Sequence, residues 1–193
     1  MAVKILAFAG SLRKDSFNKK LVRIAVEGAK SAGAETTLID MKDFPLPVYD
    51  GDLESAEGLP PNAKKLKELF LQHQGLLIAS PEYNSSIPGG LKNLIDWVSR
   101  SETKEEPSLA CFSNKVAALM SASPGGLGGL RGLVPLRAML ENIGVLVLPR
   151  QIAVSRADEA FDPNGALKDV KQDGVVRKLA AELAQTLVKL QTP

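Results

Sequence analysis

Residues 2–21 read AVKILAFAGSLRKDSFNKKL, an apolar run that ends in a glycine turn and leads into a charged, helix-like segment. Residues 2–9 are apolar apart from one lysine, a pattern typical of a strand that is covered on both faces in a parallel sheet. From 16 to 32, apolar residues recur on one stripe of a helix, and charged residues occupy the opposite face. This stretch therefore predicts a strand, a turn and a helix.

The same alternation continues along the chain. Apolar, β-rich runs recur at 35–40, 75–80, 115–122 and 144–148, and helical patterns occupy 61–74, 89–100, 129–142 and 168–190. This order predicts an α/β fold with a doubly wound, five-stranded parallel sheet in a three-layer α/β/α arrangement. Because the pattern resumes after the polar stretches, we interpret these as excursions from the sheet edge and the whole chain as one domain; they are 41–61 and 99–108, within 1–193.

The composition excludes several classes of protein. The chain has 193 residues, with 24 basic and 22 acidic side chains, so its formal charge of +2 does not indicate a nucleic-acid or membrane-surface binder. Cys111 and His73 are the only cysteine and histidine, which excludes an intrachain disulfide and multi-cysteine or multi-histidine metal sites. We interpret Cys111 as a buried strand thiol and His73 as a helix-end residue. With no signal-peptide pattern and no long apolar stretch, we expect a cytoplasmic protein without a membrane span or bound metal.

Three loops rich in glycine, serine and asparagine follow the first, third and fourth predicted strands. They read GSLRKDSFN (10–18), SPEYNSSIPGG (80–90) and SASPGGLGG (121–129). In doubly wound folds, ligands bind at the carboxyl ends of the strands, where the strand order reverses. Composition and topology therefore indicate the same ligand site.

The first loop has the chemistry of an anion site. Ser16 is a natural N-cap, but Lys19 stands where a capping box would place an acid, and cations are unfavourable in a first helical turn. A phosphate would resolve this, because it accepts N–H groups of the helix and bonds from Ser11, Ser16 and Arg13. The alternative is an ordinary cap with solvated lysines. The loop has neither the Walker A nor the G-x-G-x-x-G spacing, which disfavours nucleoside triphosphate and Rossmann sites.

The second and third loops offer a rigid surface and a flexible one. Pro81 and Pro88 fix the backbone of the second loop, where Tyr83 offers an aromatic face, Asn84 an amide, and the N–H groups after Pro81 can bond a planar heterocycle. The third loop contains four glycines within 125–129, which can form a nest of N–H donors. The alternative for Tyr83 is an ordinary surface or interface tyrosine. The alternative for the third loop is a mobile glycine-rich connector.

Together these loops resemble those of the NADPH-dependent FMN reductase family, a flavodoxin-like group that includes quinone, chromate and azo-dye reductases. The resemblance rests on G-S-L-R-x-x-S-x-N at 10–18, P-E-Y-N at 81–84 and the glycine-rich loop at 121–129, and it covers nearly the whole chain. It implies that the FMN phosphate is held by Ser11, Arg13, Ser16, Phe17 and Asn18. It also implies that the isoalloxazine is lined by Pro81, Glu82, Tyr83 and Asn84, mainly through their backbones, and approached on its other side by Ser121, Ser123 and Gly125. Pro124 departs from the family pattern because it lacks an N–H, which weakens the assignment around Gly125.

The resemblance implies an enzyme that passes a hydride from NADPH or NADH to bound FMN and then to a quinone, flavin, azo compound or metal oxyanion. No side chain needs to act as a general acid or base, so we expect no catalytic residue. Relatives of this kind imply a homodimer or homotetramer. The alternatives are a flavodoxin-like electron carrier without NAD(P)H activity, which the balanced charge disfavours, and a flavin-free binder of phosphorylated metabolites, which has no need of P-E-Y-N.

Overall fold

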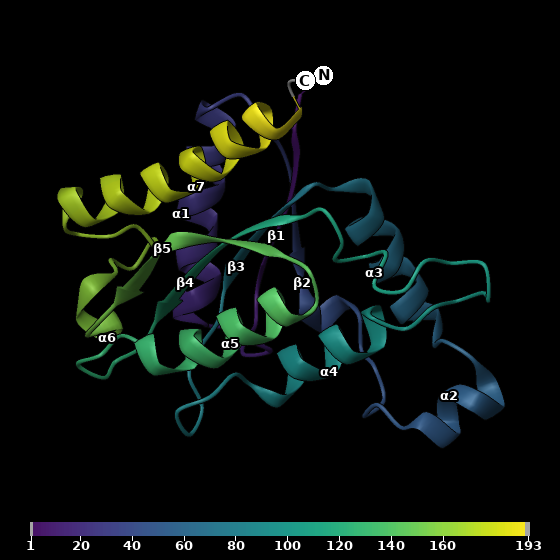
Figure 1. Ribbon diagram of the computed structural model, residues 1–193. Coiled ribbons are helices and arrows are strands. Elements are labelled where there is room, and N and C mark those ends of the chain that lie inside the picture. Colours follow the sequence, from purple (N-terminus) through teal and green to yellow (C-terminus); the bar gives the residue numbers. More distant parts are fainter. Residues whose placement is uncertain (1, 192–193) are drawn as a thin grey trace.

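The computed structural model describes residues 2–191 and contains a five-stranded sheet in the order β2-β1-β3-β4-β5 (Figure 1). All neighbouring strands pair in parallel, which confirms the predicted doubly wound α/β fold. Because β1, β3 and β4 lie inside the sheet, they are buried from end to end apart from the first residue of β1. The strands are β1 Lys4–Ala9, β2 Glu35–Asp40, β3 Gly75–Ala79, β4 Val116–Ala122 and β5 Leu146–Val154.

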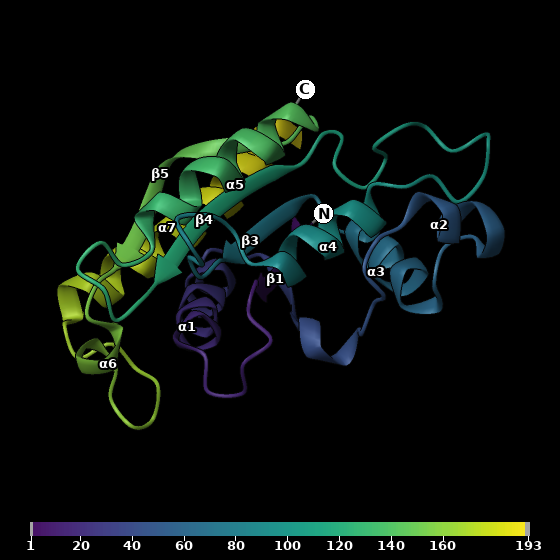
Figure 2. The same cartoon turned by 90° about the horizontal axis from the view of Figure 1, so that it is seen from below.

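Helices cover both faces of the sheet, with α1 and α7 on one side and α3, α4 and α5 on the other (Figures 1 and 2). None of the helices described within 2–191 is long and apolar enough to cross a membrane. The helices are α1 Phe17–Ser31, α2 Gly51–Glu57, α3 Pro61–Gln72, α4 Gly89–Val98, α5 Leu130–Asn142, α6 Ala157–Ala160 and α7 Val170–Gln191, with a 3₁₀ turn, η1, at Met41–Asp43.

The alternation of side chains along the strands builds two separate cores. In β1, Ile5 and Ala7 pack into the core beneath α1 and α7, whereas Leu6 and Phe8 pack into the core beneath α3, α4 and α5. Successive side chains of a strand point to opposite faces, so a strand between two helix layers must be apolar throughout. This is the physical reason for the unbroken apolar run at 2–9.

The excursion after β2 is anchored on α4 by Trp97. The indole of Trp97 is fully buried, packs against Leu59 and Ala63, and donates from Nε1 to the carbonyl oxygen of Pro47 at 2.8 Å. The excursion also contains η1 and α2, which the sequence pattern did not predict; no residue of α2 is buried. A short helix without a buried face leaves no apolar periodicity to detect.

Two sequence interpretations need correction. The fifth strand is longer than the predicted 144–148 and runs to Val154, across Pro149. Its pairing with β4 shifts register between Ala117 and Leu119, and such an irregularity on an edge strand accommodates a residue that lacks an N–H. Cys111 is buried as predicted, but it lies in a turn before β4 rather than in a strand.

Candidate functional site

Three loops meet at the carboxyl ends of β1, β3 and β4. The N–H of Gly10 donates to the carbonyl oxygen of Ala79 at 2.9 Å, and the N–H of Ser80 donates to that of Met120 at 2.9 Å. These bonds continue the sheet into the loops and bring the three together. The chain leaves β1 toward β2 on one side and returns to β3 on the other, so this is also where the strand order reverses.

The loops enclose a cavity of about 190 Å³, which we call the loop cavity. Nine of the residues proposed from the sequence line it, which shows that segments far apart in the chain converge as expected. The lining consists of Ser11, Arg13, Ser16, Phe17, Asn18, Pro81, Glu82, Tyr83, Ala122, Ser123 and Pro124.

The first turn of α1 presents unpaired donors to the loop cavity. Ser16 is the N-cap residue and is 5% exposed, but its side chain caps no backbone N–H. Within residues 2–191, the N–H groups of Phe17, Asn18 and Lys19 make no hydrogen bond, and the Arg13 guanidinium makes no ion pair. Free N–H groups, a hydroxyl and a guanidinium around one cavity fit a phosphate group.

The side chain of Asn18 is bonded to the end of β4. Its Nδ2 donates to the carbonyl oxygen of Ala122 at 2.9 Å, and its Oδ1 accepts from the N–H of Ala122 at 2.9 Å. The amide is buried and fully used, so only the backbone N–H of Asn18 remains for a phosphate. The side chain instead ties the start of α1 to the end of β4.

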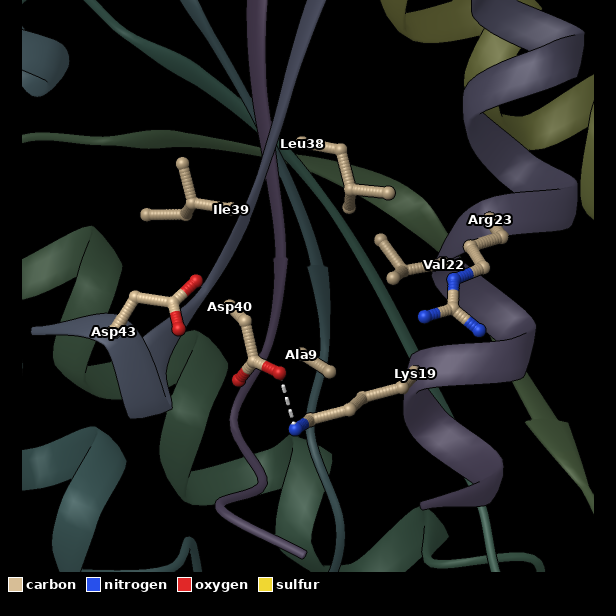
Figure 3. A pocket seen from close by; sticks show the side chains of 8 residues that line it. All are labelled: Ala9, Lys19, Val22, Arg23, Leu38, Ile39, Asp40 and Asp43. Carbon is tan, nitrogen blue, oxygen red and sulfur yellow. Dashed lines mark hydrogen bonds and ion pairs between the residues drawn. The ribbon is translucent and has the colours of Figure 1, made fainter. Parts of the chain in front are cut away.

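The lysines that follow also have partners within the chain. Figure 3 shows Lys19 reaching from α1 to Asp40 at the end of β2, with Nζ 2.5 Å from Oδ2. Partial burial raises the pKa of Asp40, but the Lys19 ammonium and the N–H of Lys42 outweigh burial and hold that pKa below its usual value. Lys20 lies over the Phe17 ring, with Nζ 5.5 Å from the centroid. The lysines therefore need no external anion, and the phosphate argument depends on the donors around Ser16 and on Arg13.

The pocket in Figure 3 measures about 230 Å³ and lies between the end of β2 and the first turns of α1. Asp40 occupies the place at the end of β2 where a dinucleotide fold has a ribose-binding acid. Here Lys19 engages that carboxylate, consistent with the absence of the G-x-G-x-x-G fingerprint from the first loop.

The second loop forms a tight hairpin turn at 83–86. Tyr83 and Ser86 exchange backbone hydrogen bonds of 2.9 and 3.0 Å, and Asn84 and Ser85 take positive φ angles of 52° and 63°. Within residues 2–191, the N–H groups of Glu82 and Asn84 make no hydrogen bond. The turn thus offers free backbone donors beside the half-exposed Tyr83 ring, as a planar heterocycle requires.

The carboxylate of Glu82 is bound by the first turn of α5. Its Oε1 accepts from Nε of Arg131 at 2.8 Å, and its Oε2 accepts from the N–H of Gly132 at 3.3 Å. Glu82 is therefore available to a ligand through its backbone, as the resemblance implied. Arg131 was not anticipated: its partner is 49 residues away, and a lone arginine early in a helix carries no sequence signal of such a contact.

The third loop lines an adjoining cavity of about 380 Å³, which we call the glycine-loop cavity. It shares Glu82 and Ser123 with the loop cavity, so the two adjoin. The N–H of Gly125 donates to Oγ of Ser123 at 3.2 Å and is not free for a ligand. The lining consists of Glu82, Asn84, Ser85, Ser123, Gly125, Gly126, Leu127, Gly128, Gly129 and Arg131.

Ser121 lines neither cavity. It is fully buried, its Oγ has no partner within residues 2–191, and a Cβ on Gly129 would collide with it. Gly129, the N-cap residue of α5, takes a φ of 87°, so this glycine both adopts a left-handed conformation and covers the Ser121 hydroxyl. Access of a ligand to Ser121 would require movement of the third loop.

The sheet has a flavodoxin-like strand order, and a cavity whose donors fit a phosphate lies where that order reverses. These two features define a class of nucleotide-binding α/β proteins. Comparison with known families narrows this class. The chain belongs to the NADPH-dependent FMN reductase family, whose model matches residues 3–159.

Individual relatives agree with this assignment. An NAD(P)H-dependent FMN reductase of Pseudomonas aeruginosa is 37% identical, over 91% of this chain and 90% of the relative. A quinone reductase of Escherichia coli K12 is 36% identical, over 76% of this chain and 73% of the relative. The structure of the flavoenzyme NAD(P)H:(acceptor) oxidoreductase from Paracoccus denitrificans superimposes with a TM-score of 0.79 at 27% identity, covering 97% of this chain and 98% of that one.

These comparisons confirm the predicted family, fold class, FMN cofactor and NAD(P)H-dependent reductase activity. The comparisons therefore disfavour both alternatives from the sequence. An electron carrier would have no NAD(P)H-dependent activity, and a flavin-free binder of phosphorylated metabolites would have no FMN. The roles of individual site residues stay predictions.

Proposed function

We propose that this chain oxidises NAD(P)H and reduces a quinone-type acceptor, with FMN held across the loop cavity and the glycine-loop cavity. The observation that carries the proposal is the set of unpaired donors around the loop cavity: the free N–H groups at the start of α1, the uncapped Ser16 and the unpaired Arg13. Relatives named as quinone reductases and NADPH:quinone oxidoreductases support the choice of acceptor.

In this proposal the residues bind and orient, and none transfers a proton. Ser11, Arg13 and Ser16, with the N–H groups of Phe17 and Asn18, hold the phosphate. The backbones of Pro81, Glu82, Tyr83 and Asn84 support the isoalloxazine on one side, and Ser123, with Gly125 in the wall beside it, faces it from the other. When bound, FMN would supply the redox chemistry, a hydride transfer from NAD(P)H and a transfer of reducing equivalents to the acceptor. Donors fixed around its ring would stabilise negative charge on the reduced form.

We also propose that residues 1–193 form one domain and that the chain is a cytoplasmic homodimer or homotetramer. Apolar side chains exposed near the cavities support self-association, since such surfaces often mark interfaces; they are Tyr83, Leu127, Leu130 and Val134. Light scattering tests the assembly. A mass of two or four times the 20.6 kDa chain is expected, and a monomer would contradict it.

A visible spectrum of the FMN-supplemented protein tests the main proposal. Anaerobic NADPH should bleach a bound-flavin band near ~450 nm, and a quinone added afterwards should restore it. A repeat with NADH measures the preference for the donor. Flavin, azo-dye and chromate acceptors, compared in the same assay, test the choice of acceptor.

Three results are informative. Bleaching followed by recovery with quinone supports both half-reactions. Bound flavin that NADPH does not bleach would contradict the reductase activity of this chain and favour an electron carrier. A protein that binds no FMN would contradict the proposal altogether.

A further inference from the structure

Glu82 and Arg131 form a partly buried ion pair between the 81–86 segment and α5. The Glu82 side chain is 8% exposed, and its Oε1 lies 2.6 Å from Nη2 of Arg131 and 2.8 Å from Nε. A carboxylate removed from water is unfavourable unless charged or hydrogen-bonding partners compensate it, and a side-on arginine is well suited to this. Loss of Arg131 would therefore leave an uncompensated carboxylate against the turn.

Helix α5 also packs directly on the backbone of this segment. A Cβ on Gly132 would lie 3.1 Å from Cβ of Glu82 and 3.1 Å from the carbonyl oxygen of Ser86. The N–H of Gly132 reaches Oε2 of Glu82 at 3.3 Å. The start of α5 therefore fixes Glu82 from its side chain and its backbone at once.

The free donors of the site belong to the segment that this contact holds. The N–H groups of Glu82 and Asn84 are unpaired within residues 2–191, and Asn84 and Ser85 keep positive φ angles that non-glycine residues rarely adopt. A turn with such angles persists only where its surroundings hold it. A contact that restrains Glu82 therefore also restrains the direction of these donors.

We propose that Arg131 is a positioning residue for bound flavin, acting through Glu82 to hold the donors of the 81–86 segment toward the isoalloxazine. This inference rests on the proposed function. Arg131 itself is 61% exposed on its side chain and lines the outer part of the glycine-loop cavity. Its effect on flavin should therefore depend on Glu82 and disappear when the Glu82 charge is removed.

The test is a double-mutant cycle with Arg131→Leu, Glu82→Gln and both together, read by FMN affinity and by the reduction potential of bound FMN. Arg131→Leu should weaken FMN binding about tenfold and shift the potential, because loss of one charged hydrogen bond is a change of this order. Adding Glu82→Gln should restore part of the affinity, since no uncompensated charge remains. The FMN affinity of Arg131→Lys should lie between those of Arg131→Leu and the wild type.

Arg177→Leu is the matched control. Arg177 pairs with Asp173 on α7 through Nε and Oδ1 at 2.5 Å, so its loss removes a similar ion pair on a helix that lines neither cavity. FMN affinity and potential should equal those of the wild type.

Two results would overturn the inference while leaving the proposed function intact. One is wild-type flavin affinity and potential in Arg131→Leu. The other is strictly additive losses in the double variant, which would mean that Arg131 contacts the ligand by itself. A wild-type chain that binds no FMN would instead contradict the proposed function, and this inference with it.

Discussion

At the start of α1, neighbouring side chains contact different parts of the molecule. Ser16 leaves its hydroxyl uncapped at the loop cavity, Asn18 bonds the backbone of Ala122, and Lys19 reaches Asp40. Successive residues of a helix point about 100° apart, so each faces a different neighbour. The first turn is consequently tied to β2 and to β4 while its N–H groups stay free.

Arg13→Ala tests the phosphate site at this scale. The variant should lose about 1.5 kcal/mol of FMN binding, or roughly tenfold in Kd, which is the lower end for a hydrogen bond to a charged group because Arg13 is exposed. Fluorescence quenching of FMN measures the Kd. Arg23→Ala, an exposed arginine of the Figure 3 pocket, is the control and should bind FMN as the wild type does. Equal affinities in all three proteins would remove Arg13 from the site.

Asn18→Ala tests the bond between α1 and β4. The variant should unfold with about 2–3 kcal/mol less free energy, because a buried N–H and a buried carbonyl of Ala122 lose their partners. It should also bind FMN more weakly, since the first turn is no longer fixed against the third loop. Urea unfolding and FMN titration measure the two effects.

Asn93→Ala is the matched control for this prediction. Asn93 of α4 likewise makes two hydrogen bonds to backbone groups, those of Tyr49 and Pro47 in the excursion after β2, and it lines neither the loop cavity nor the glycine-loop cavity. The Asn93→Ala substitution should lower the free energy of unfolding without weakening FMN binding. Equal loss of FMN binding in both variants would mean that the Asn18 effect is one of stability alone.

Among the secondary-structure elements, the end of α3 is joined to the edge strand by the single histidine. His73 ends the helix as the sequence predicted, with Nδ1 2.6 Å from the carbonyl oxygen of Leu69 and Nε2 2.7 Å from Oγ1 of Thr37. A neutral ring satisfies both contacts, donating from Nδ1 and accepting at Nε2. Burial lowers the pKa of His73, and the nearby charges of Lys115 and Lys4 lower it further, against an opposing contribution from the Leu69 carbonyl.

This lowered pKa predicts a loss of stability on acidification. As the pH falls below 6.5, the unfolded chain binds a proton at His73 more readily than the folded chain does, so the free energy of unfolding decreases. Urea unfolding between pH 8 and pH 5 should show this decrease in the wild type and a smaller one in His73→Gln. Parallel curves for the two proteins would contradict the prediction.

Across the whole molecule, α7 completes the layer that α1 begins. Leu179 and Leu183 of α7 share one buried core with Leu21 of α1, and a Cβ on Gly28 would collide with the backbone of Arg177. Only a glycine allows the two helices to approach so closely. Although the family match ends at residue 159, α7 is therefore part of the same packed unit, which supports the proposed single domain.

FMN should stabilise this unit measurably. A ligand that binds only the folded state at about 100 times its Kd adds about 2.7 kcal/mol, which raises Tm by roughly 5–10 °C for a chain of this length. Differential scanning calorimetry measures the shift. Riboflavin, which lacks the phosphate, is the matched ligand and should give a clearly smaller shift. Equal shifts would contradict a phosphate held at the start of α1.

The sequence predicted the strands and the ligand loops better than it predicted the short helices and individual site residues. The apolar runs predicted five strands and the three loops at their carboxyl ends, because burial between two helix layers leaves an unbroken apolar pattern. The pattern missed η1, α2 and α6, which are short, and ended the fifth strand too early at a proline on the sheet edge. In the site, nine predicted residues line the loop cavity, and Asn84 and Gly125 line the adjoining one, but Ser121 lies in neither.

The sequence by itself determined the fold, the family and the position of the ligand loops, since these depend on periodicity and on local motifs. Only the tertiary structure decided what individual side chains contact. The Asn18 amide bonds a backbone 104 residues away, Lys19 pairs with Asp40, and Arg131 holds Glu82. Such partners are brought together by the packing of helices on the sheet, and no spacing within a single stretch of chain specifies them.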